Sequence, residues 1–320
     1  MYSKNIATVL SCIAFLFSIA NAAENPIRII VPFAPGGSTD QAARIVAAGL
    51  SPILGVPVIV EHKAGAGGLI GTLAAAKAPP DGTVLYVGNI STMGIYPALQ
   101  PTHPAFSEAP LIPISKIADI TEVLLVNNAS GITSVDALVQ RAKLNPGKLG
   151  FATVGSGSVS RMETELFKKA TGVLPILVPY QGGGPALNAM LGEHITAMFS
   201  PQALVAPHFR AGTLRPLAVT STKRISELPD VPTFLELGFP SLQVSSWQAL
   251  FAPRGTPLET VDRIFNALKK VLNDPENQKK FAAGGMTAAI SASSSEFASY
   301  VKADVDRWST IVREEKITAD

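Results

Sequence analysis

The sequence is almost free of cysteine and has no excess of either charge. Cys12 is the only thiol among 320 residues, and it lies in an N-terminal segment that we expect to be removed. A mature chain without Cys12 would hold no disulfide, no cysteine-ligated metal and no cysteine nucleophile. Lysine and arginine number 26 against 24 acidic residues, and no basic run is interleaved with aromatic residues. We therefore expect no nucleic-acid partner.

Long hydrophobic runs are missing except at the N-terminus. Residues 1–22 combine Lys4, an apolar stretch and the small residues Ala20-Asn21-Ala22, which is the pattern of a secretory signal peptide. The apolar stretch is too short for a membrane span. Lipidation at Cys12 is an alternative that Leu10 and the short preceding apolar sequence disfavour. We expect cleavage after Ala22 and export of the remaining chain.

Motifs of nucleotide-binding proteins, hydrolases and zinc sites are also missing. No glycine-rich turn is followed by the lysine of a phosphate loop, and the glycines at 65–68 do not complete G-x-G-x-x-G. Asp40 stands where a serine-hydrolase elbow requires its second glycine, and the four histidines form no H-E-x-x-H pattern. We expect Asp40 to accept hydrogen bonds from backbone amides at a helix start. We expect no cofactor, no metal and no enzymatic activity; a hydrolase that uses Ser38 or Ser158 is the alternative, without a matching His–Asp arrangement.

After residue 26, short apolar strands alternate with helical segments, which is typical of a parallel α/β fold. The predicted strands of a first block cover residues 27–33, 56–63 and 83–89. A second block of the same kind begins near residue 122. No flexible linker separates the blocks, which indicates two lobes joined by more than one crossing of the chain.

The remaining segments are predicted to be irregular or helical. Residues 96–114 are rich in proline and are predicted to be irregular surface chain. The last block is predicted to be mainly helical. Thr256 and Ser293 each begin a capping box, because a glutamate follows three residues later.

Three glycine-rich turns each follow a predicted strand and open a predicted helix, at residues 34–40, 153–160 and 181–186. Such turns present unpaired backbone N–H groups and the positive end of a helix dipole. Hydroxyl side chains gather in the first two turns: Ser38, Thr39, Thr153, Ser156, Ser158 and Ser160. Strand–helix packing alone accounts for a single turn of this kind. Three in one chain favour a cleft that binds an anion.

Several segments together resemble a known family. The segments "PIRIIVPFAPGGSTDQAAR", "VPYQGGGPALNAMLG" and "SSWQALFAPRGTP" resemble the extracytoplasmic solute-binding receptors of tripartite tricarboxylate transporters, the Bug family. The resemblance spans the mature chain. It implies a periplasmic-binding-protein-like α/β fold with a ligand cleft between two lobes, the first of them discontinuous. The implied division is a signal peptide of residues 1–22, a first lobe of 23–121 and 233–320, and a second lobe of 122–232.

The function implied by the resemblance is transport. The receptor would be a monomer in the periplasm that captures a small organic carboxylate and delivers it to the membrane permease subunits of a tripartite tricarboxylate transporter. A receptor that presents the carboxylate to a membrane signalling protein would use the same fold and pocket. The sequence does not separate these two functions.

The resemblance also implies ligand-binding residues, with a carboxylate held by backbone amides and hydroxyls at helix N-termini. Carried over by position, they are Phe33, Ala34, Gly36, Gly37, Ser38, Thr39, Asp40, Ser91 and Thr92 in the first lobe, and Thr153, Gly155, Gly157, Ser158, Arg161, Tyr180 and Ser200 in the second.

The chain departs from the family pattern at Arg161, where histidine is frequent, at Ser200, where aspartate is common, and at Tyr96, where asparagine is common. Arg161 has two interpretations. It forms an ion pair with Glu165 one helical turn away, or it binds a second acidic group of the ligand.

Overall fold

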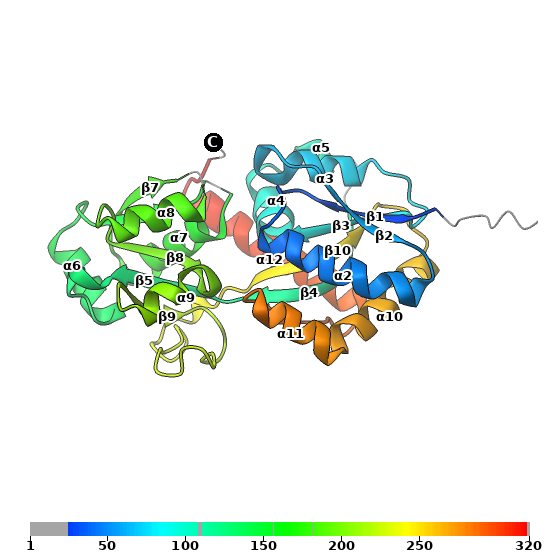
Figure 1. Ribbon diagram of the computed structural model, residues 1–320. Coiled ribbons are helices and arrows are strands. Elements are labelled where there is room, and N and C mark those ends of the chain that lie inside the picture. Colours follow the sequence, from blue (N-terminus) through cyan, green and yellow to red (C-terminus); the bar gives the residue numbers. More distant parts are fainter. Residues whose placement is uncertain (1–24, 108–110, 156, 181, 319–320) are drawn as a thin grey trace, which may run out of the picture.

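The computed structural model describes residues 25–107, 111–155, 157–180 and 182–318. The predicted signal peptide, Cys12, Ser156 and Gln181 lie outside these residues. Two sheets form the centres of two lobes that lie side by side (Figure 1). The chain is therefore a two-lobed α/β protein, as the sequence predicted.

The first lobe contains a six-stranded sheet with the strand order β11-β4-β10-β3-β1-β2. Strands β1, β2 and β3 are parallel, whereas β10 runs antiparallel to β3 and β4. The strands are β1 (Ile27–Val31), β2 (Val58–His62), β3 (Val84–Asn89), β4 (Ile112–Ile120), β10 (Ser246–Ala252) and β11 (Thr287–Ala288).

Helices cover both faces of this sheet because its central strands are apolar on both sides. The helices of the first lobe are α2 (Ser38–Leu54), α3 (Leu69–Ala76), α4 (Tyr96–Leu99), α5 (Pro104–Ser107), α10 (Leu258–Asn273), α11 (Pro275–Ala283) and α12 (Ser294–Glu314). A short 3₁₀ turn, η1 (Ala66–Gly68), precedes α3, and a π-helical turn, η2 (Ser91–Ile95), precedes α4. Ile29 and Val31 of β1 pack with Val46 and Leu50 of α2 in one fully buried cluster.

The second lobe contains a five-stranded sheet with the order β7-β6-β8-β5-β9. Its strands are β5 (Glu122–Asn127), β6 (Gly150–Thr153), β7 (Ile176–Pro179), β8 (Ala197–Pro201) and β9 (Leu214–Val219). Its helices are η3 (Asn128–Ser130), α6 (Val135–Leu144), α7 (Val159–Thr171), α8 (Gly183–Leu191), α9 (Gln202–Arg210) and η4 (Pro240–Leu242). Parallel β6 and β7 each lead into a helix, so their carboxyl ends carry the second and third glycine turns.

The chain crosses between the lobes twice in the segments that join the sheets. Thr121 alone separates β4 of the first sheet from β5 of the second. The return precedes β10, because Phe234 still packs against Phe167 and Phe199 of the second lobe, with ring centroids 6.5 and 5.9 Å apart. We propose that the first lobe resumes after Leu242. This boundary differs from the one expected from the sequence, which lies at residue 233.

Helix α12 lies between the lobes (Figure 1). It contacts β4 and η2 of the first lobe and α7 of the second. No helix within the described ranges is both long enough and apolar enough to span a membrane.

Candidate functional site

The first glycine turn connects β1 to α2 and is closed by Asp40. Gly36 adopts a left-handed φ of 96°, and Gly37 is the N-cap of α2 without a side-chain cap. The Gly36 N–H donates to Asp40 Oδ2 at 2.8 Å. Ala34, Gly36 and Gly37 are exposed, so the backbone at the start of α2 is open to a ligand.

The Asp40 carboxylate is buried and fully engaged with its neighbours. His62 Nε2 lies 2.7 Å from Asp40 Oδ1, and Arg44 Nε lies 2.9 Å from the same oxygen. Burial raises the pKa of Asp40, but the hydrogen bonds from Gly36, His62 and Arg44 outweigh it and lower this pKa below its ordinary value. Asp40 therefore shapes the turn as an acceptor, as expected.

The end of β3 supports the same turn from the neighbouring strand. Thr39 Oγ1 donates to Gln248 Oε1 at 2.9 Å, and Asn89 Nδ2 donates to Thr39 Oγ1 at 3.4 Å. Asn89 and Thr92 bond reciprocally, since each backbone N–H donates to the other side chain at 3.0 Å. These bonds hold Thr39 and Thr92 in buried positions. Gln248 lies in β10, 209 positions after Thr39 in the sequence, and its supporting role was not predicted from the sequence.

The second glycine turn connects β6 to α7 and is held by serine hydroxyls. Ser158 is the N-cap of α7: its Oγ accepts from the Arg161 N–H at 3.2 Å and donates to the Gly155 carbonyl at 2.8 Å. Ser160 Oγ lies 3.1 Å from Ser158 Oγ and accepts from the Val154 N–H at 3.2 Å. The hydroxyl of Ser158 therefore caps α7 and ties the cap to the preceding turn.

The Arg161 side chain lies along α7. Its Nε donates to Glu165 Oε1 at 2.9 Å, and its terminal nitrogen lies 2.8 Å from the same oxygen. Lys168 forms an ion pair with the other oxygen of Glu165. The arrangement matches the first interpretation, an i,i+4 ion pair, and the Glu165 side chain in it is buried.

Tyr180 and Ser200 lie on strands or turns beside the second glycine turn. The Tyr180 N–H donates to the Thr153 carbonyl at 2.8 Å, and its half-buried ring packs against the cluster around α8. Ser200, near the end of β8, is 1% exposed, and its Oγ has no hydrogen-bond partner among the described residues.

Tyr96 brings the two halves of the predicted site together, although it was not among the predicted ligand-binding residues. A Cβ placed on Gly157 would lie 2.6 Å from Tyr96 Cζ, and one on Gly67 would lie 2.0 Å from its Oη. The tip of the Tyr96 ring therefore lies between η1 of the first lobe and the glycine turn of the second. A Cβ on Gly68 would lie 2.7 Å from Thr92 Cγ2 and 3.4 Å from the Phe33 ring. Phe33, Thr92 and Gly157 are thus linked through one run of close contacts.

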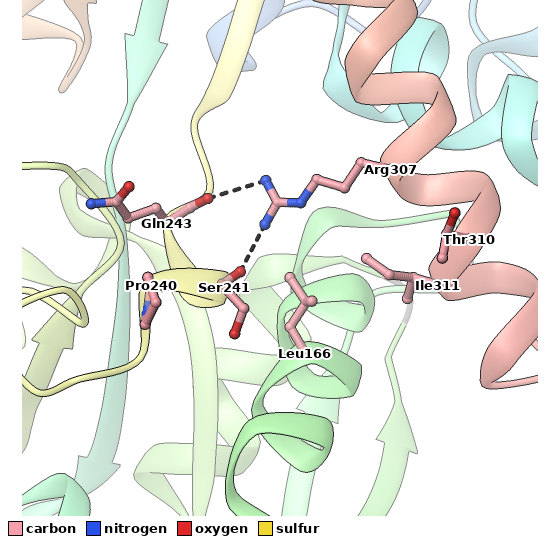
Figure 2. Close-up of a pocket in the computed structure, with 7 residues that line it drawn as sticks. All are labelled: Leu166, Pro240, Ser241, Gln243, Arg307, Thr310 and Ile311. Carbon is pink, nitrogen blue, oxygen red and sulfur yellow. Dashed lines mark hydrogen bonds between the residues drawn. The ribbon is translucent and has the colours of Figure 1, made fainter.

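Two cavities lie between the lobes, away from the predicted ligand-binding residues. A pocket of about 530 Å³ lies between α12, α7 and η4, where Arg307 donates to the carbonyls of Ser241 and Gln243 at 2.7 and 3.1 Å (Figure 2). A cavity of about 620 Å³, which we call the hinge cavity, is lined by Lys116, Thr121, Ser245 and Arg307, among others. Neither lining includes a predicted ligand-binding residue.

The chemistry of the described residues offers no hydrolase-like arrangement at the two candidate serines. His62 contacts Asp40, and the bonds of Ser158 run to Gly155, Ser160 and Arg161. In the parts of the chain that the structure describes, no three histidine, cysteine, aspartate or glutamate residues form a group that could hold a metal ion. The site instead contains two glycine turns, one from each lobe, and each leads into a helix N-terminus of the kind that binds anions.

Comparisons with known proteins agree with this architecture. The family model for the tripartite tricarboxylate transporter family receptor matches residues 42–317. Protein BugT of Bordetella pertussis is 38% identical over 290 residues, which cover 90% of this chain and 89% of that protein.

Two solved structures of similar proteins contain small organic acids. MatC of Rhodopseudomonas palustris, with bound malate, is 30% identical with a TM-score of 0.77, covering 90% of this chain and 98% of MatC. Another protein of that organism, with adipate, is 30% identical with a TM-score of 0.81, covering 93% of this chain and 99% of its own. The chain belongs to the solute-binding receptor family of tripartite tricarboxylate transporters, and it has the two-lobed, periplasmic-binding-protein-like fold of that family.

Proposed function

We propose that this receptor captures a small organic carboxylate between its two lobes, in the periplasm, and delivers it to the permease subunits of a tripartite tricarboxylate transporter. The observation that carries the proposal is the approach of the second-lobe turn at Gly157 to Tyr96 and Gly67 of the first lobe. It brings the start of α7 close to loops that follow strands of the first sheet.

The chemistry of these turns suits a carboxylate. The first N–H groups of α2 and α7 have no partner within their helices, and the helix dipoles favour a negative charge beside them. The predicted ligand-binding residues remain our proposal for the contacts, with the Ser38, Thr39 and Ser158 region closest to the charge. Arg161 is engaged with Glu165, so we propose backbone amides and hydroxyls as the main partners of the carboxylate.

The relatives narrow the choice of ligands to test. Malate and adipate, bound by two similar receptors, are both dicarboxylates. A micromolar dissociation constant corresponds to about −8 kcal/mol, which a few charge-assisted hydrogen bonds and burial of a small ligand can supply.

A thermal-shift screen of mono-, di- and tricarboxylates on residues 23–320, followed by calorimetry, tests the proposal. We expect at least one small carboxylate to raise the melting temperature and to bind with a stoichiometry of one. If no carboxylate shifts the melting temperature at millimolar concentration, the proposed ligand class is wrong.

The proposed export and oligomeric state are tested separately. N-terminal sequencing should show that the exported protein begins at Ala23. In sedimentation experiments, the free protein should be a monomer.

A further inference from the structure

Tyr96 extends from the first lobe onto the glycine turn of the second. It is the first residue of α4, directly after the π-helical turn that follows β3. Its ring atoms Cζ, Cε2 and Cε1 would lie 2.6, 2.8 and 2.9 Å from a Cβ on Gly157. Real Cβ atoms do not approach ring atoms so closely, so the ring rests directly on the Gly157 backbone.

The same ring tip is also confined on its other side. A Cβ on Gly67 would lie 2.0 Å from Tyr96 Oη and 2.6 Å from its Cζ. The phenol end is thus held between a glycine of each lobe. Gly67 has a left-handed φ of 63°, which already favours glycine, whereas Gly157 is not among the glycines with positive φ. At Gly157 the space taken by the Tyr96 ring, rather than the backbone conformation, excludes a side chain.

We propose that Tyr96 is an interlobe wedge that sets the width of the ligand cleft and thereby restricts the receptor to short-chain dicarboxylates. The selection for length rests on the proposed function, whereas the wedge itself does not. Because the ring occupies the space over Gly157, a ligand held by the second-lobe turn must share the cleft with the phenol. Each added methylene of the ligand then has less room. A tightly packed pocket distinguishes two ligands that differ by one methylene by about tenfold or more in affinity.

The wedge is tested without a ligand by a double-mutant cycle. Gly157→Ala should lower the melting temperature of the free protein, because the new methyl group collides with the Tyr96 ring. In a Tyr96→Ala background the same Gly157→Ala change should have little effect, since the collision is gone. Gly184→Ala is the matched control: no atom lies within 4 Å of its added Cβ, so its effect should be the same in both backgrounds.

Equal effects of Gly157→Ala in both backgrounds would overturn the wedge, because they would mean that the ring does not rest on Gly157 in solution. Tyr96→Phe should retain the coupling, since it keeps the ring. A loss of coupling in Tyr96→Phe would show that the hydroxyl rather than the ring makes the contact, and it would also overturn the proposal.

The selection for length is tested by calorimetry with succinate, glutarate, adipate and pimelate. We expect the natural protein to bind each longer acid of this series more weakly. In Tyr96→Ala, the ratio of the affinity for succinate to that for pimelate should be smaller by about tenfold or more. Tyr96→Phe should behave like the natural protein. The same length dependence in the natural protein and in Tyr96→Ala would overturn the selection. If no acid of the series binds either protein, the selection for dicarboxylate length is wrong, while the thermal-shift screen still decides the ligand class and the double-mutant cycle still decides the wedge.

Discussion

At the scale of single residues, the buried carboxylate of Asp40 holds the first glycine turn in its shape. Its carboxylate accepts from Gly36, contacts His62 and pairs with Arg44. Hydrogen bonds to charged groups of this kind contribute about 1.5–3 kcal/mol each when buried. The geometry of the first glycine turn therefore depends on one ionised group.

We predict that Asp40→Asn lowers the free energy of unfolding at pH 7 by about 1.5–3 kcal/mol. Because the pKa of Asp40 is lowered in the folded protein, its stabilisation is present above the ordinary value of 3.8 and is lost as the pH falls through the folded-state pKa. The difference between the variant and the natural protein should therefore shrink in acid. Urea unfolding at several pH values measures both effects.

Asp136→Asn is the control for this prediction. Asp136 also lies in the first helical turn, of α6, but it is exposed. Its loss should cost at most about 1 kcal/mol, the usual contribution of a charge at a helix N-terminus. An Asp40→Asn variant as stable as Asp136→Asn at pH 7 would show that the Asp40 bonds add little.

Local residue roles were predictable from the sequence, whereas long-range partners were not. The acceptor role of Asp40 follows from its place at the start of a helix, and the pairing of Arg161 with Glu165 follows from i,i+4 spacing. His62 lies 22 positions from Asp40, and Gln248 lies 209 positions from Thr39. These two contacts depend on how strands are ordered in the sheet, which no local pattern encodes. The wedge at Tyr96 depends on the approach of the two lobes and was missed for the same reason.

At the scale of elements, the start of α7 combines a structural cap with the proposed binding turn. Ser158 Oγ satisfies the Arg161 N–H, which would otherwise lack a partner within the helix. The α6 helix begins in the same way, because Ser134 Oγ accepts from the Ala137 N–H at 3.1 Å. Only the first of these two caps lies in a predicted binding turn.

We predict that Ser158→Ala and Ser134→Ala both lower the free energy of unfolding, by about 0.5–2 kcal/mol each. Only Ser158→Ala should also weaken carboxylate binding, by about 1.5–3 kcal/mol, because it removes a hydroxyl donor to the ionised ligand. Denaturant unfolding and calorimetry with the best ligand of the screen measure the two effects. Equal affinities of the two variants would limit Ser158 to capping.

Capping patterns gave a mixed result. The predicted box at Ser293 is confirmed at its N-cap, because Ser293 Oγ accepts from the Glu296 N–H at 3.0 Å. The predicted box at Thr256 is wrong: α10 has Pro257 at its N-cap, and Thr256 Oγ1 donates to the Pro253 carbonyl at 2.8 Å instead. The Pro253 carbonyl lies within hydrogen-bonding distance of the Thr256 hydroxyl, and this local bond forms in place of a cap on α10.

Strand β4 was missed because its sequence is weakly patterned. Residues 96–114 were predicted to be irregular, yet β4 begins at Ile112 and includes Pro113. Its residues alternate poorly between apolar and polar, and a proline normally argues against a strand inside a sheet. The strand forms because it pairs with β10 and covers the core, with register shifts that accommodate its irregularity.

At the scale of the whole molecule, two buried glutamates lie where the lobes meet. Glu122 is the first residue of β5 after the crossing, and Glu163 lies on α7. Burial raises the pKa of Glu122 to about 8, although a hydrogen bond with Ser246 opposes the shift. Burial and the neighbouring Glu122 raise the pKa of Glu163, against the opposing charge of Arg307. In the described structure both carboxyl oxygens of Glu163 lack a hydrogen-bond partner.

We predict that the natural protein loses stability as the pH rises from about 5 to 8. A carboxyl group with a raised pKa binds its proton more tightly in the folded state, so folding is favoured at low pH, and this gain is lost as the pH rises from the unfolded-state pKa to the folded-state pKa. Glu122→Gln should make this slope shallower and should be more stable than the natural protein at pH 8. Exposed Glu259→Gln is the control and should leave the slope unchanged. Urea unfolding at half-unit pH steps measures the slope of the free energy of unfolding against pH. If Glu122→Gln has the same slope as the natural protein, the prediction is wrong.

A crystal structure of residues 23–320 with the carboxylate of largest thermal shift tests the central claim most directly. The account predicts that density for the ligand lies between the turn at residues 33–40 and the turn at Gly155, Gly157 and Ser158. One carboxylate should lie within hydrogen-bonding distance of backbone amides at the start of α2 or α7. Density for the acid in the hinge cavity beside Lys116 and Arg307, with both glycine turns free of ligand, would contradict the account.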